Sequence, residues 1–157
     1  MTRWLVVGLT ALSSCAPHSR REAQPSYGEL VASPPFVATD YVIDVIASGQ
    51  QPAVLLTIVP AAPNSEPTIR RRFVTTALAA SMLNDMAVLA SARPESRECT
   101  DSTAYLIVVQ TGNEARSRVT SSCQPTSRRA ASRVHLRARS IFGDAVPASP
   151  GWIDPRS

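Results

Sequence analysis

The chain has 157 residues, of which 16 are basic, 12 are acidic and two are histidines, so its formal net charge is +4. A charge this mild does not require nucleic acid as a partner, and aromatic residues, at 5%, are too few for a base-stacking surface. The length fits one modest domain with tails, and such a chain can bury a hydrophobic core of its own.

The N-terminus has the features of an export signal. Arg3 precedes a short apolar run over residues 4–12, which is far shorter than the roughly 20 apolar residues that span a bilayer. The sequence Leu12-Ser13-Ser14-Cys15 resembles the lipobox of bacterial lipoproteins. This resemblance implies that residues 1–14 are a signal peptide and that the thiol of Cys15 carries a lipid such as palmitate. An ordinary secretory signal cut near Ala16 is the alternative.

A lipid on Cys15 would make the membrane the first partner and would place the mature protein in the cell envelope. Ala16 follows the cysteine, where an aspartate often marks lipoproteins retained in the inner membrane. We therefore expect the outer membrane, facing the periplasm, rather than the inner membrane. Residues 15–38 are rich in Pro, Ser and Ala without hydrophobic periodicity, which predicts a flexible tether.

Two apolar, β-branched segments, residues 41–47 and 53–59, predict a pair of strands. The second segment is nearly all apolar and is expected in the interior of a sheet. Residues 49–52 contain a glycine and a proline, so the two strands are predicted to form a hairpin.

The sequence predicts a helix over residues 65–92, with Ser65 as its N-cap and Pro94 beyond its end. Three arginines, residues 70–72, then fall in its first turn, where cations oppose the helix dipole, and the sequence offers no account of them.

This helix would be apolar on two sides, which is typical of a helix covered on both. One side is expected to meet the sheet. The other side, which includes Leu78, Met82 and Leu89, is expected to face a second helix or a partner protein.

A second hairpin is predicted from two strands over residues 104–109 and 115–120, with Gly112-Asn113 as the two-residue loop. The following segment, residues 126–142, has alternating residues typical of a strand, but its helical wheel places the apolar residues on one face. We favour the helix, with Gly143 at its end. Residues 144–157 are predicted to be an irregular tail.

The cysteines predict a disulfide. If Cys15 is lipidated, Cys99 and Cys123 remain, and an exported chain meets an oxidising compartment. The predicted register places Cys123 opposite Ser102, so a bond to Cys99 requires the chain before that strand to fold back, because bonded Cα atoms lie within about 7 Å.

Chemistry-bearing motifs are sparse, so we predict no catalytic residues, no metal site and no cofactor. His18 lies on the predicted tether, and His135 lies between arginines and is expected at the surface. Asp40 and Asp44 share one face of a strand, but catalysis by a carboxylate pair also requires an enclosed pocket.

These elements predict an α+β domain over residues 39–143, with an antiparallel four-stranded sheet made of two hairpins, helices on one face and the order ββαββα. The segment from Cys99 through Cys123, followed by the predicted helix, resembles the small protein inhibitors of thermolysin-like metalloproteases. No inhibitory loop is recognised, so no site residue follows from the resemblance. We expect a lipid-anchored envelope module that binds a protein or has a structural role. An envelope protease inhibitor is the alternative, and a hydrolase is the weakest hypothesis.

Overall fold

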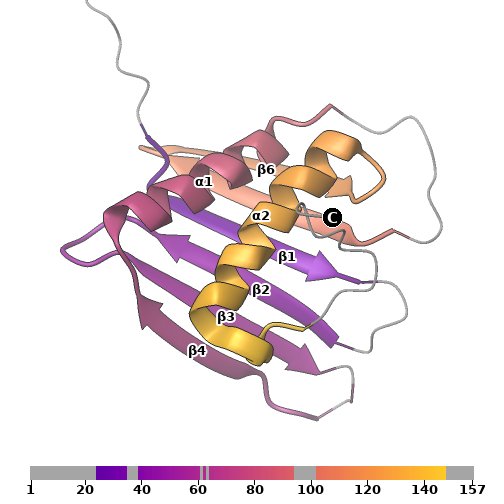
Figure 1. Cartoon of the computed structure of the whole chain (residues 1–157). Coiled ribbons are helices and arrows are strands. Elements are labelled where there is room, and N and C mark those ends of the chain that lie inside the picture. Colours follow the sequence, from indigo (N-terminus) through magenta and orange to yellow (C-terminus); the bar gives the residue numbers. More distant parts are fainter. Residues whose placement is uncertain (1–23, 35–38, 61, 63, 94–101, 148–157) are drawn as a thin grey trace, which may run out of the picture.

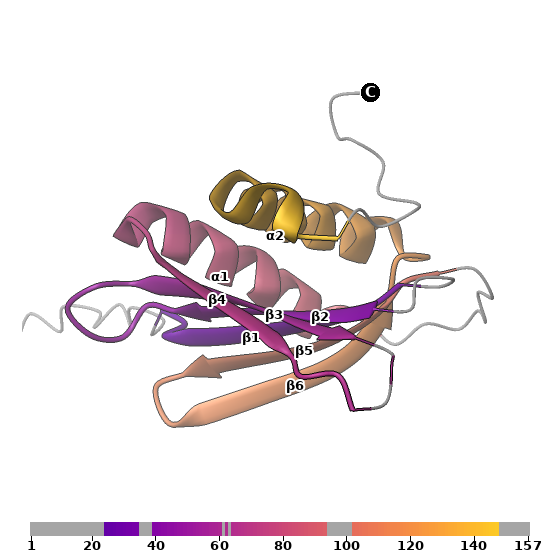
Figure 2. The ribbon, with the colours of Figure 1, turned by 90° about the horizontal axis from the view of Figure 1, so that it is seen from below.

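The computed structural model of the protein describes residues 24–34, 39–60, 62, 64–93 and 102–147. They form one six-stranded antiparallel sheet, and two helices lie together on one of its faces (Figures 1 and 2). The elements in chain order are β1 (Tyr27–Ser33), β2 (Thr39–Ile46), β3 (Ala53–Pro60), β4 (Thr68–Phe73), α1 (Thr76–Ala90), β5 (Ala104–Thr111), β6 (Glu114–Ser121), α2 (Pro125–Phe142) and a short 3-10 turn, η1 (Gly143–Ala145).

The predicted four-stranded sheet with the order ββαββα is wrong. The strands lie in the order β4-β3-β2-β1-β5-β6, and the chain runs ββββαββα. Both additional strands come from segments that were assigned to other structures, since β1 lies within the predicted tether and β4 within the predicted helix. The element order on which the resemblance to metalloprotease inhibitors partly depended is therefore not the order of this chain.

Strand β1 lies in the interior of the sheet, paired with β2 on one side and β5 on the other. Its side chains alternate, and Leu30 and Ala32 are completely buried under the helices. A Cβ atom at Gly28 would lie 2.6 Å from Sδ of Met86 and 2.8 Å from Cδ2 of Leu83, so the glycine allows α1 to approach the sheet closely. The small residues that make this packing possible also weaken the hydrophobic pattern of the strand.

The predicted helix over residues 65–92 is wrong in its first third. Residues 68–73 form the edge strand β4, paired with β3, and every side chain of β4 is exposed. The helix begins only after Thr75, whose hydroxyl accepts a hydrogen bond from the Leu78 backbone N–H at 3.2 Å. The arginines at positions 70–72 thus lie on a sheet edge, where charged side chains oppose pairing with another chain.

The remaining predicted elements correspond closely to the structure. Strands β2 and β3 form the first hairpin, and β5 and β6 form the second. Thr111 pairs with Glu114 across a turn in which Gly112 has a φ of +59°, so the predicted register is confirmed. Residues 126–142 are helical and belong to α2, with Gly143 as the C-cap. No helix in the described part of the chain is long and apolar enough to cross a membrane.

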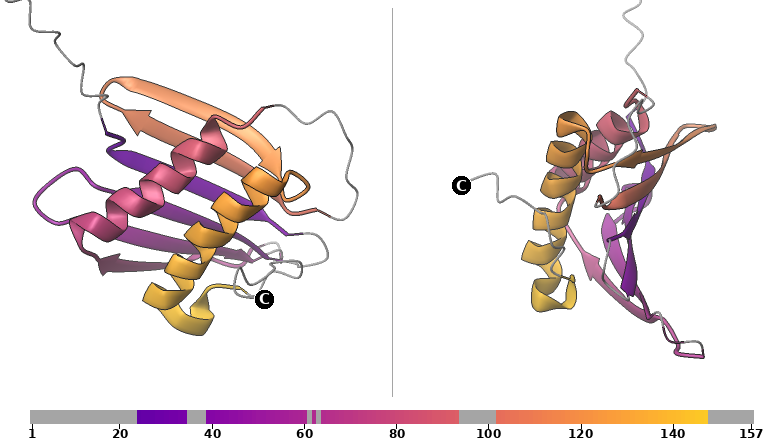
Figure 3. Two further views of the ribbon diagram at one scale, coloured as in Figure 1. Left: turned by 45° about the horizontal axis from the view of Figure 1, so that its top comes forward. Right: turned by 90° about the vertical axis from the view of Figure 1, so that its right-hand side faces the viewer.

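The two helices lie over one face of the sheet (Figure 3), and buried side chains of both layers form the hydrophobic core. Met82 and Leu89 of α1 are completely buried in it, and Leu78 is partly buried against it. These three residues were predicted to face a second helix or a partner protein. Helix α1 packs against both α2 and the sheet, and together they cover Met82 and Leu89. These two side chains are therefore not available to a partner.

Candidate functional site

The two faces of the sheet have different surroundings. The helices cover one face, and no described helix lies on the other (Figures 2 and 3). We call this second surface the open face. It consists of the odd-numbered residues of β1, β3, β4 and β6 and the even-numbered residues of β2 and β5, as the strand pairing requires.

An apolar row crosses the open face from one edge of the sheet to the other. Val31 on β1 lies opposite Val42 on β2 and Leu106 on β5. The pairing extends this row to all six strands, in the order Ile69, Thr57, Val42, Val31, Leu106 and Val119. The side chains at both ends of the row are largely exposed, at 63% for Ile69 and 69% for Val119.

Most of the exposed large hydrophobic side chains gather on this face. Among the described residues they number seven, and five of them belong to the open face: Val59, Ile69, Phe73, Leu106 and Val119. The other two, Val88 and Leu136, are on the helices. Apolar residues scattered singly need no explanation, but a contiguous group on one surface is typical of an interaction site.

The centre of the open face is acidic. Glu29 on β1 and Asp44 on β2 lie directly opposite each other. The hydroxyl of Tyr27 is 2.7 Å from Oδ1 of Asp44 and 3.1 Å from Oε2 of Glu29. Burial, and then the two carboxylates, raise the pKa of Tyr27 above its ordinary value, so the hydroxyl keeps its proton and acts as the donor.

Arginines lie at the outer strands of the sheet rather than at its centre. Arg71 belongs to the open face, and its guanidinium carbon lies 5.1 Å from the ring centroid of Phe73, a cation–π arrangement. Arg70 and Arg72 on β4, and Arg116 and Arg118 on β6, point to the other side of the sheet. Arg118 is partly buried, and the other three are exposed. The open face is therefore acidic in the middle, apolar around it and basic at its β4 edge.

His135 is buried, and the prediction of a surface histidine is wrong. It is 2% exposed, and its Nδ1 lies 2.9 Å from the hydroxyl oxygen of Tyr41. Burial, with a smaller effect of Arg139, lowers the pKa of His135 to about 4, and burial raises the pKa of Tyr41. Both groups are therefore neutral, the histidine tautomer decides which of them donates the hydrogen bond, and this contact joins α2 to β2 inside the core.

A second buried polar contact joins the helices. Asp85 of α1 accepts a 2.8 Å hydrogen bond from Nε of Arg133 on α2, and its other oxygen is paired with Arg137. The side chain of Asp85 is only 10% exposed, so both arginines compensate for its burial. These ion pairs hold the helices together, and none of the three residues lines the hollow between the end of α1 and the start of α2.

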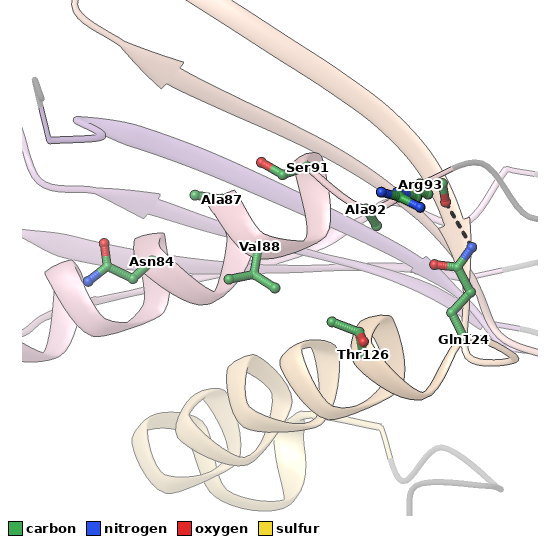
Figure 4. Close-up of a pocket in the computed structure, with 8 residues that line it drawn as sticks. All are labelled: Asn84, Ala87, Val88, Ser91, Ala92, Arg93, Gln124 and Thr126. Carbon is green, nitrogen blue, oxygen red and sulfur yellow. Dashed lines mark hydrogen bonds between the residues drawn. The ribbon is translucent and has the colours of Figure 1, made fainter.

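The hollow between the end of α1 and the start of α2 has a volume of about 590 Å³ (Figure 4). Gln124 closes one end, since its side-chain amide donates to the backbone oxygen of Arg93 at 2.8 Å. The residues that line the hollow are Asn84, Ala87, Val88, Ser91, Ala92, Arg93, Gln124 and Thr126. None of them is a carboxylate, histidine or cysteine, so this lining offers no general acid, base or thiol nucleophile.

The other predicted sites have different outcomes. Cys15 and Cys99 lie outside the described residues, so lipidation and the disulfide stay predictions. Cys123 follows β6, and its backbone N–H donates to the hydroxyl of Ser121 at 3.2 Å. Asp40 and Asp44 do share one face of β2, as predicted, but the partners of Asp44 come from the segment assigned to the tether. Among the described residues, no three His, Cys, Asp or Glu side chains are placed to hold a metal ion.

Comparisons of the chain with models of protein families, with characterised proteins and with solved structures give no match.

Proposed function

We propose that this protein is a non-catalytic binding module of the cell envelope, anchored by a lipid on Cys15 and binding a protein partner through the open face. The observation that carries the proposal is the apolar row from Ile69 to Val119, which no described helix covers. The lipobox-like sequence ending in Cys15 supports the envelope location, with the outer membrane favoured because Ala16 is not an aspartate.

The open face replaces the helix surface as the expected binding surface. Met82 and Leu89 are enclosed by the core of the same chain. By contrast, Leu106 is 41% exposed and belongs to the apolar row, between Val31 of β1 and Val119 of β6. Covering such a surface with a partner removes apolar area from water. This contributes about 25 cal/mol for each Å² buried, against the entropy that is lost on association.

Leu106→Asp is expected to abolish partner binding without unfolding the protein. The aspartate would lie in water in the free protein but would be buried and unpaired in a complex, which costs several kcal/mol. The measurement is crosslinking and pull-down from envelope extract with the full chain, accompanied by a melting curve. Leu136→Asp is the matched control, because Leu136 is 39% exposed on α2. Retention of the same partners by both variants would contradict the proposed surface.

Cys15→Ser is expected to remove the lipid and to release the protein, or its uncut precursor, from the membrane fraction. A serine hydroxyl cannot carry the thioether-linked lipid, and no described helix replaces the anchor. The measurement is detergent-phase partitioning of the wild type and the variant from cells. If the variant still partitions into the detergent phase as the wild type does, the lipobox interpretation is rejected.

A further inference from the structure

The acidic centre of the open face has an unbalanced charge. Glu29 and Asp44 are direct cross-strand neighbours, and like charges in this arrangement destabilise a sheet. Tyr27 contacts both carboxylates, but its hydroxyl has only one hydrogen to donate. Within the described part of the chain, no cation forms an ion pair with either carboxylate.

The carboxylate pair is surrounded by apolar residues that a partner would cover. Val31 and Val42 flank the carboxylate pair on one side, and Ile46 lies next to Tyr27 on the other. All three are partly buried already by their neighbours in the sheet. A partner that covers these side chains would also remove water from Glu29 and Asp44, so it must supply a compensating positive charge.

We propose that the protein partner places an arginine between Glu29 and Asp44 while its apolar side chains cover the surrounding row. This inference rests on the proposed function and specifies the chemistry of the partner. A guanidinium fits best because its planar fork can donate to two acceptors at once, whereas an ammonium acts as a point charge. The arginine also relieves the repulsion between the two carboxylates, which the free protein leaves in place.

Two other occupants fit the surface less well. A second copy of this chain, stacked two-fold over the same centre, would bring four carboxylates together without a cation between them. A divalent ion such as Ca²⁺ takes six to eight oxygen ligands, and only two carboxylates converge here.

The inference is tested with short amphipathic helical peptides whose apolar face is leucine and whose centre is arginine, citrulline or glutamate. Citrulline has the shape of arginine without its charge. Calorimetry with the full chain is expected to show the arginine peptide binding roughly tenfold more tightly than the citrulline peptide, and the glutamate peptide most weakly. Raised salt is expected to reduce the difference between the arginine and citrulline peptides.

The variant Glu29→Gln/Asp44→Asn removes both charges and is expected to bind the arginine and citrulline peptides equally. The matched control, Glu66→Gln/Asp144→Asn, removes the same charge from exposed positions off the open face and is expected to keep the tenfold preference. A preference that survives in the first variant would overturn the inference, and so would a wild type that shows none. Absence of binding by every peptide, or self-association of the wild type through the open face, would also overturn it.

Leu106→Asp separates this inference from the proposed function. Suppose that Leu106→Asp weakens the binding of all three peptides and that the wild type binds the arginine and citrulline peptides equally. The open face is then a binding surface, and only the arginine inference fails. If Leu106→Asp changes no affinity, the peptides do not bind the open face, and the proposed function fails as well.

Discussion

Met82→Glu is expected to lower the free energy of unfolding by about 4 kcal/mol or more, a large part of the 5–15 kcal/mol typical of a domain. Met82 is completely buried on the side of α1 that packs into the hydrophobic core. A carboxylate there must be buried without a partner or take up a proton, and either change destabilises the native state.

The matched control for this variant lies on the same helix. Val88 is 42% exposed, so Val88→Glu introduces the same carboxylate into α1 in contact with water. Its free energy of unfolding is expected to remain within about 0.5 kcal/mol of that of the wild type. Chemical denaturation of all three proteins provides the comparison. Equal midpoints for Met82→Glu and the wild type would show that Met82 is not in the core.

Acidification is expected to destabilise the protein through His135. Its folded-state pKa is about 4, against 6.5 for an unperturbed histidine. Above pH 6.5 both states are neutral at this group, and between pH 6.5 and 4 the unfolded state binds the additional proton. Stability is therefore lost as the pH falls through this window, by about 3 kcal/mol when complete.

The measurement is the free energy of unfolding from pH 7.5 to 4 for the wild type and for His135→Gln. The glutamine amide can either accept a hydrogen bond from Tyr41 or donate one to it, but it does not titrate, so the difference between the two proteins isolates the histidine. The wild type is expected to lose more stability on acidification than the variant. Parallel curves would show that His135 titrates normally in the folded protein.

The sequence predicts the structure most accurately where a turn residue or a capping residue restricts the backbone. Gly112 and Asn113 leave two residues for the loop of the second hairpin, and this alone specifies the pairing of Thr111 with Glu114. Similarly, Gly143 adopts a positive φ at the end of α2, where the helix was expected to stop. Both signals are local, so they do not depend on the rest of the fold.

The missed elements depend on tertiary contacts. In β1, the inward residues include Gly28 and Ala32, which are small because a helix packs over them, so the strand lacks a strong apolar alternation. In β4, exposed arginines give no periodicity, and Ser65 competes with Thr75 as a cap signal. The acidic site was missed for the same reason, because Tyr27 and Glu29 belong to β1.

The position of β1 also determines how the domain responds to force. A lipid anchor on Cys15 would pull on the chain at Tyr27, where β1 begins, and not at an edge strand. In antiparallel pairing the hydrogen bonds are perpendicular to the strands, so a pull along β1 shears its bonds to β2 and β5 together instead of opening them one after another. The domain would therefore resist unfolding most strongly at β1, the strand through which a lipid anchor on Cys15 would pull.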